Sequence, residues 1–268
     1  MKFKRQSAVL RRPDRINGND PITEEREDET MKRSEINATI RKFEALLEEC
    51  RFCLPPYLSF TPDEWKTKNH EYDEIRDNEL GWDVTDYGEG HFETLGLALI
   101  TIRNGNIHNP EYPKPYAEKI MMCDSGQVSP MHYHVNKMED IICRGGNDIV
   151  FTFYNADQSR VHRQEDGRDV FEKDLENDVL IYRDGRRYKV RAGEPVRIHK
   201  GESITLVPYQ YHEFIIPAGG PSLIGEVSKV NDDHTDNFFH EPLGRFPHIE
   251  EDEPAYRLLC TEYPKAKD

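Results

Sequence analysis

Two histidines and a glutamate near the middle of the chain have the spacing of metal ligands. His132 and His134 are separated by one residue, and because side chains alternate between the faces of a β-strand, both rings would point to the same side. Glu139 follows after a short bend, so imidazoles and a carboxylate can converge on one small volume. An isolated H-x-H is a weak signal, but the full pattern G-x5-H-x-H-x4-E-x6-G, from Gly126 to Gly146, is specific. It predicts a site for a divalent ion.

A fourth ligand is expected from a later strand that returns beside the first. His212 suits this role, because it follows a β-like run that Pro208 interrupts. The two segments together resemble the cupin superfamily, whose small β-barrel holds one divalent ion with three histidines and one glutamate. Gln210 departs from the usual second motif, in which glycine is common at that place. The other candidates for the fourth ligand are His199, His234 and His240.

This expected ligand set suits Mn²⁺, Fe²⁺, Co²⁺, Ni²⁺ or Zn²⁺ without selecting among them. An octahedral ion would keep two neighbouring positions open, where the two oxygens of a hydroxy-carbonyl unit can replace water. The ion then acts as a Lewis acid on the carbonyl and lowers the pKa of the neighbouring hydroxyl. The motif therefore favours an enzyme that acts on a chelating, oxygen-rich substrate.

The rest of the chain predicts a mainly β fold with helices at its N-terminal end. Residues 1–30 have little apolar content and are expected to form a flexible extension. A helix is expected after Met31, with Ser34 as its N-cap, and a second, short helix is expected after Thr61. From Gly81 onward, short β-like runs alternate with turns. The apolar stripe of the first helix consists of Ile36, Ile40, Phe43 and Leu47. Strands are expected at residues 95–103, 149–154, 179–182, 188–191, 196–199, 203–207 and 213–216. Residues 31–268 are thus predicted to form a single cupin (double-stranded β-helix, or jelly-roll) barrel with a helical cap.

Several further segments narrow the resemblance to the D-lyxose isomerase family. They are Trp82–Asp86, Leu99–Gly105, Gly225–Asp233, Asp236–Asn237, the run Glu241-Pro-Leu-Gly-Arg245-Phe-Pro, and Ile249–Glu253. The resemblance covers the chain from Met31 to about Pro264. It implies a homodimeric, Mn²⁺-dependent aldose–ketose isomerase. Such an enzyme interconverts D-lyxose with D-xylulose, and D-mannose with D-fructose, through a metal-chelated enediol.

An enediol route needs a base beside the carbon acid and a group that exchanges protons with the sugar oxygens. Glu241 is the first choice for the base, because it lies in the family-like segment, and Glu226 on a predicted strand is its rival. Lys137, two residues before Glu139, is expected to stabilise developing enediolate charge, and Asp252 to orient the sugar hydroxyls or Lys137. Structural alternatives remain, such as an ion pair of Glu241 with Arg245 or a solvated acidic face around Asp252.

Bulk composition excludes several functional classes. A formal net charge of -15 disfavours nucleic-acid binding. No apolar run is long enough to cross a bilayer, and the basic N-terminus lacks the apolar core of a secretory signal. Five cysteines, an odd number, fit a reducing compartment, so we expect a cytoplasmic protein. A monosaccharide substrate is what the family resemblance implies. The competing functions are a cupin dioxygenase and a non-enzymatic sugar-binding cupin.

Overall fold

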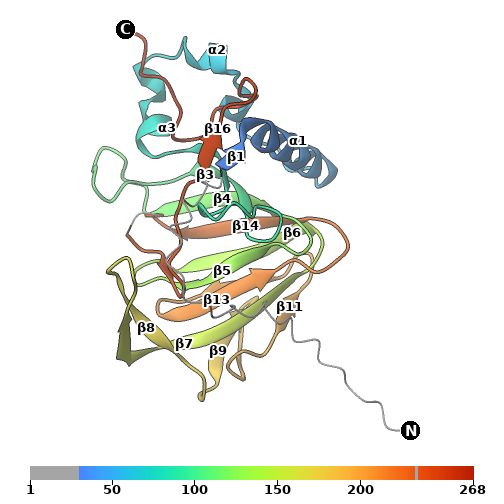
Figure 1. Ribbon diagram of the computed structural model, residues 1–268, viewed down its shortest axis with the longest axis vertical. Coiled ribbons are helices and arrows are strands. Elements are labelled where there is room, and N and C mark those ends of the chain that lie inside the picture. Colours follow the sequence, from blue (N-terminus) through green and yellow to red (C-terminus); the bar gives the residue numbers. More distant parts are fainter. Residues whose placement is uncertain (1–29, 233–234) are drawn as a thin grey trace, which may run out of the picture.

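Two antiparallel β-sheets face each other in the computed structural model, which describes residues 30–232 and 235–268 (Figure 1). The larger sheet has the strand order β10-β9-β12-β6-β14-β4-β3-β2, and the smaller has the order β11-β7-β13-β5-β15, with β8 paired to β7. The larger sheet consists of β2 (Gly81–Thr85), β3 (Leu97–Arg103), β4 (Tyr116–Cys123), β6 (Glu139–Gly146), β9 (Val179–Arg183), β10 (Arg186–Val190), β12 (Ser203–Leu206) and β14 (Ser222–Lys229). The smaller consists of β5 (Val128–Tyr133), β7 (Ile149–Arg163), β8 (Asp169–Asp174), β11 (Val196–Ile198), β13 (Gln210–Ile215) and β15 (Phe238–Phe239). Many neighbouring strands are distant in sequence, as in a jelly roll.

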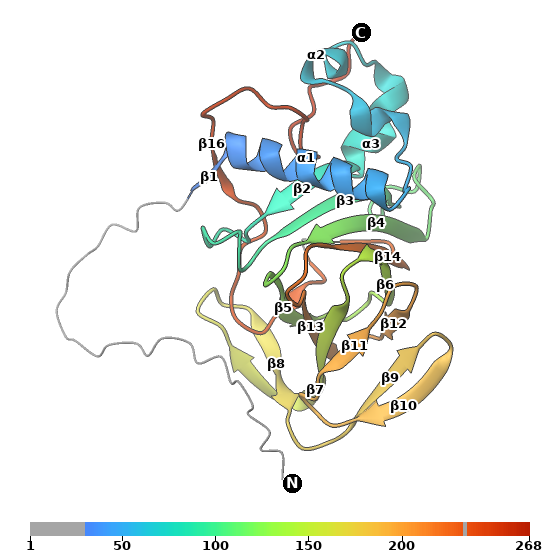
Figure 2. The ribbon, with the colours of Figure 1, turned by 90° about the vertical axis from the view of Figure 1, so that its right-hand side faces the viewer.

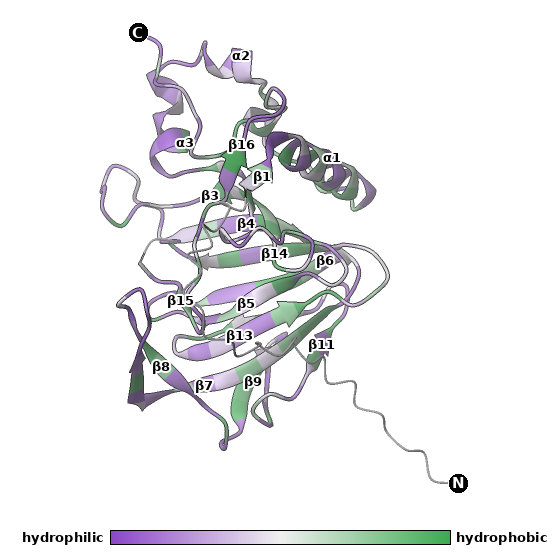
Figure 3. Ribbon diagram, viewed as in Figure 1, coloured by the Kyte–Doolittle hydropathy of each residue, from purple (hydrophilic) through white to green (hydrophobic). Residues whose placement is uncertain are grey.

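The main hydrophobic core lies between the two sheets. Along β7, Ile149, Phe151 and Phe153 are fully buried and alternate with partly exposed residues, which is the period of a strand with one face in the core. Phe214 on β13 packs its ring against Phe151, with centroids 5.6 Å apart. Hydrophobic and hydrophilic bands alternate along strands of both sheets (Figure 3). The predicted mainly β, jelly-roll barrel with N-terminal helices is confirmed.

Helix α1 (Arg33–Glu49) covers part of the outer face of the larger sheet. It lies across β2 and β3 (Figure 2). All four residues of its predicted apolar stripe are buried, and Phe43 makes an edge-on ring contact with Trp82 of β2 at 5.6 Å. The other helices are η1 (Pro56–Ser59), α2 (Pro62–Trp65), η2 (His70–Tyr72) and α3 (Asp73–Asp77). Thr61 caps α2 as predicted, since its hydroxyl oxygen accepts a hydrogen bond from the Glu64 N–H at 3.2 Å.

The start of α1 differs from the prediction. The helix begins at Arg33, so Ser34 lies in the first turn and is not the N-cap. The backbone N–H and the hydroxyl of Ser34 donate to the Asp252 carboxylate at 2.9 and 2.6 Å. A distant acidic residue therefore satisfies the helix terminus, and no local sequence pattern could show this. The same C-terminal segment carries β16 (His248–Glu250), which pairs in parallel with β1 (Thr30–Lys32).

Each strand predicted by its range overlaps an observed strand, with ends shifted by a few residues. The largest difference is β7, which extends to Arg163 because β8 pairs with its second half. β4 and β8 are among the strands that lie where none is predicted. The predicted flexible extension, residues 1–30, falls outside the described residues except for Thr30, and the division into an extension and a single domain stays a prediction.

The α1 packing supports a stability prediction. Replacing Phe43 with alanine is expected to lower the free energy of unfolding by roughly 3–5 kcal/mol, because a fully buried ring would leave a cavity against Trp82. Urea denaturation followed by Trp fluorescence measures this loss. Glu48→Ala, on the exposed side of the same helix, is the matched control and is expected to change stability by less than about 0.5 kcal/mol. Equal losses in both variants would contradict the docking of α1.

Candidate active site

The two sheets bring four predicted metal ligands to one point of the barrel interior. His132 lies on β5 and pairs directly with His212 on the neighbouring β13, while His134 follows the end of β5. Glu139 begins β6 in the facing sheet. One ligand atom from each of these four residues lies within 4.8 Å of the others. Ligands from both sheets thus surround a volume that a single ion can fill.

Hydrogen bonds fix the tautomers of the three histidines. The Nδ1 atoms of His132, His134 and His212 lie 2.8, 2.7 and 3.0 Å from the carbonyl oxygens of Pro130, Asp236 and Gln210. A carbonyl only accepts, so each Nδ1 carries a proton and each neutral ring has a lone pair on Nε2.

Those lone pairs face a carboxylate without a proton between them. The Nε2 atoms of His134 and His212 lie 3.3 and 3.5 Å from Oε1 of Glu139, and the buried Nε2 of His134 makes no hydrogen bond. Acceptors that converge in this way need a cation, so the residues fit a divalent metal.

The electrostatic environment keeps these groups in the forms that bind metal. Burial, and then the neighbouring histidines, hold the pKa of His132 well below its usual value. Burial and the positive charge of Lys137 also lower the pKa of His134. For Glu139, burial acts to raise the pKa, but Lys137 and the histidines outweigh it and hold the pKa well below its usual value. Neutral imidazoles and an ionised carboxylate are the states required for coordination.

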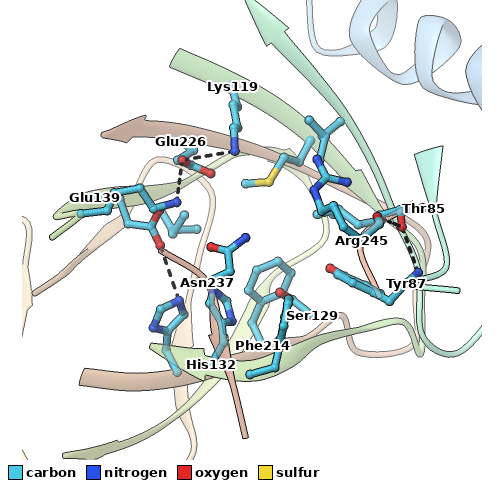
Figure 4. Close-up of a pocket in the computed structure, with 17 residues that line it drawn as sticks. Thr85, Tyr87, Lys119, Ser129, His132, Glu139, Phe214, Glu226, Asn237 and Arg245 are labelled. Atoms are coloured by element: carbon cyan, nitrogen blue, oxygen red, sulfur yellow. Dashed lines mark hydrogen bonds and ion pairs between the residues drawn. The ribbon is translucent and has the colours of Figure 1, made fainter. Parts of the chain in front are cut away.

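A second polar cluster adjoins the ligands and contains Glu226 and two lysines (Figure 4). The Nζ of Lys137 lies 2.7 Å from Glu139 and 3.4 Å from Glu226, so this ammonium joins the two carboxylates. Lys119 is directly opposite Glu226 on the adjacent strand β4, with its Nζ 3.9 Å from the carboxylate. The Nζ of Lys119 also donates to the Asn231 side chain at 2.8 Å. A buried carboxylate held between two ammonium groups therefore faces the cavity.

Sequence reasoning missed Lys119, Asp236 and Arg245. The carboxylate of Asp236 accepts hydrogen bonds from the backbone N–H groups of Val135, Asn136 and Lys137, at 2.9, 3.0 and 2.7 Å. Its backbone carbonyl oxygen accepts the hydrogen bond from Nδ1 of His134. Asp236 thus holds the bend that carries the ligands. The family-like Asp236–Asn237 pair is the one feature of the sequence that indicated a role for Asp236. For Lys119, only the pairing of β4 with β14 reveals that its side chain lies beside Glu226.

The cavity at these groups has a volume of about 70 Å³ and both polar and apolar walls. Lys119, Glu226 and Glu139 lie on one side of it, and Arg245 and Tyr87 lie on the other (Figure 4). Arg245 forms an ion pair with Asp83 of β2, which is 2% exposed. The alternative considered for Glu241, an ion pair with Arg245, is not among the ion pairs of the described residues, in which Glu241 lies 3.8 Å from His240.

Two of the four proposed catalytic residues do not lie at this cavity. The side chain of Glu241 is 69% exposed and lies 3.8 Å from His240 Nε2, and Asp252 caps α1. Neither lines the cavity, whereas Lys137 and Glu226 both do. Among the competing ligands, His199 is bound to Asp148 at 3.0 Å and His240 stands apart from the cluster. His234 lies outside the described residues.

Comparisons with known proteins agree with this geometry. A model of the D-lyxose isomerase family matches residues 31–263. The chain belongs to the D-lyxose isomerase family. It is 43% identical over 235 residues to the D-lyxose/D-mannose isomerases of Escherichia coli O157:H7 and Serratia proteamaculans, a match that covers 87% of this chain and 98% of each relative. Family membership confirms the predicted resemblance and makes the chain an isomerase.

A solved structure supports the fold of this D-lyxose isomerase family member. L-ribose isomerase of Acinetobacter sp. DL28, in complex with L-ribose, superposes with a TM-score of 0.51 and 13% sequence identity over 82% of this chain and 98% of that chain. At this identity the likeness concerns the fold alone.

All five cysteines are free, and none of the helices in the described ranges could span a membrane.

Proposed function

We propose that this isomerase interconverts D-lyxose with D-xylulose, and D-mannose with D-fructose, through an enediol with Mn²⁺ as its cofactor. The observation that carries the proposal is the shared cavity in which the ligand set and the Lys137–Glu226–Lys119 cluster meet. The names of the relatives, which are D-lyxose/D-mannose isomerases, support the choice of sugars. We also propose that the protein is a homodimer, as the family resemblance implies, and that it is cytoplasmic, as its five cysteines and its basic N-terminus favour.

Glu226 is the proposed base, in place of Glu241. Its carboxylate is buried, faces the cavity and is held by two ammonium groups, so it can take the proton from C2 of the aldose and return it to C1. The net reaction also moves a proton from O2 to O1. Lys137 is placed to exchange that proton and, with Lys119, to stabilise negative charge on the sugar oxygens. When bound, the divalent ion supplies Lewis-acid polarisation of the carbonyl.

The apolar part of the cavity leaves one alternative to be tested. Leu97, Leu99, Met121, Ile141 and Phe214 line it together with the polar groups, and a cupin dioxygenase would also have an apolar cavity. The cluster of lysines and carboxylates favours a polyhydroxylated substrate. The family supports the same choice.

An anaerobic assay with EDTA-treated protein tests the proposal. We expect D-xylulose to form from D-lyxose only after Mn²⁺ is added back, because the histidine lone pairs need a cation before the site can polarise a carbonyl. A ketose colour reaction follows the product. No ketose from D-lyxose or D-mannose, despite bound metal, would exclude the isomerase reaction. Oxygen-dependent substrate loss would then indicate a dioxygenase, and sugar binding without turnover would indicate a binding protein.

A further inference from the structure

A second cavity adjoins the candidate active site and has no place in the chemistry described above. It has a volume of about 190 Å³, and polar residues such as Asp83, Asn104, Asn231 and Asp232 line much of it. Arg245 lines both cavities, so this guanidinium stands where they meet.

The strand register shows that the two cavities continue along one face of the larger sheet. Lys119, which lines the first cavity, is directly opposite Thr101 of β3, which lines the second. Asp83 of β2 lines the second cavity and is opposite Leu99, which lines the first. Residues that are paired across strands point to the same face of a sheet. The two cavities therefore meet at β3, where Leu99 lines the first and Thr101, two residues further along the same strand, lines the second.

Much of the wall of the first cavity is apolar, formed by Leu97, Leu99, Met121, Ile141 and Phe214, and its charged groups gather around the metal ligands and Glu226. The end of the sugar with the carbonyl is expected to lie at those charged groups. The remaining hydroxyl-bearing carbons need adjacent polar space, and the second cavity offers it.

We propose that the second cavity receives the end of the sugar remote from the carbonyl, with Arg245 as the contact at the junction. The inference rests on the proposed function. A hexose extends one carbon further than the corresponding pentose, so it depends more strongly on this space. Asparagine side chains and carboxylates suit the hydroxyl groups of that end, as expected for a polar subsite. The residues of this cavity therefore set the preference between D-mannose and D-lyxose.

Filling the second cavity tests this inference. Thr101 is 7% exposed at its inner end, and Ile107 is 62% exposed at its rim, so Thr101→Leu and Ile107→Trp reduce the space from two sides. Each variant is expected to lower the ratio of kcat/KM for D-mannose to kcat/KM for D-lyxose by about tenfold, the effect of one misfitted carbon in a pocket. Val161→Trp is the matched control, because Val161 is 54% exposed and lines neither cavity. Its ratio should equal that of the unaltered enzyme.

A binding measurement separates this inference from the proposed reaction. D-mannitol and D-arabitol are the unreactive reduced forms of the two aldoses. Titration calorimetry of the metal-loaded protein should show that both variants lose more affinity for D-mannitol than for D-arabitol. The inference would be overturned if both variants kept the ratio of kcat/KM for D-mannose to kcat/KM for D-lyxose, and the ratio of affinities for D-mannitol and D-arabitol, within twofold of the unaltered protein. If Thr101→Leu does not fold, Ile107→Trp decides. If the unaltered protein turns over neither aldose, the proposed reaction fails, and the two polyols still test the cavity.

Discussion

Glutamine in place of Glu226 is expected to lower kcat for D-lyxose by roughly a thousandfold, within the usual range for a general base. The amide keeps the shape of the side chain but cannot accept the C2 proton. Metal content should stay unchanged, because Glu226 is not among the four grouped ligands. Steady-state kinetics, with elemental analysis of the purified protein, measures both. In D₂O the unaltered enzyme should incorporate deuterium at C1 of the ketose, as an enediol route requires.

Two controls distinguish Glu226 from the other candidate acids. Glu241→Gln and Asp252→Asn are expected to keep kcat within about twofold, because the first carboxylate is exposed and the second binds Ser34. If Glu241→Gln lost activity while Glu226→Gln kept it, the base would be Glu241, and the structure would have to bring it to the cavity. Complete retention of the C2 hydrogen in the product would instead favour a hydride shift.

Alanine in place of His134 is expected to weaken Mn²⁺ binding by more than about a hundredfold. Partners outside the coordination sphere already contribute 10- to 100-fold, so a direct ligand should contribute at least as much. The change also removes the imidazole that lies 3.3 Å from Glu139, so that Lys137 remains beside this carboxylate without His134. Calorimetric titration of the stripped protein with MnCl₂ gives the affinity, and turnover should fall in parallel.

The matched control for this change is His199→Ala. His199 is another histidine on the β-barrel, with a side chain 60% exposed and paired with Asp148. Its replacement should leave the Mn²⁺ affinity unchanged. Undiminished Mn²⁺ binding by a folded His134→Ala protein, or an equal loss in both variants, would mean that the cluster is not the metal site.

The contrast between ligands and proton-transfer groups shows how far sequence reasoning reaches. His132, His134 and Glu139 lie within eight residues of one another, and the period of a strand predicts that they converge. The prediction of His212 was less direct, because its side chain reaches the other three residues only when β13 pairs with β5. Glu241 and Asp252 were chosen for their place in family-like segments, yet their side chains lie away from the cavity. A local motif reports composition but gives no direction for a side chain.

The sequence by itself indicated the mainly β fold and the group of candidate metal ligands, because these depend on alternation along strands and on closely spaced motifs. The family followed from the resemblance of several segments along the chain. Only the tertiary structure decided that Glu226, Lys119 and Arg245 share one cavity. These residues are far apart in the chain and meet because β4 pairs with β14 and because Asp83 of β2 holds Arg245. Strand pairing between distant segments depends on the packing of the whole barrel, and no short stretch of sequence encodes it.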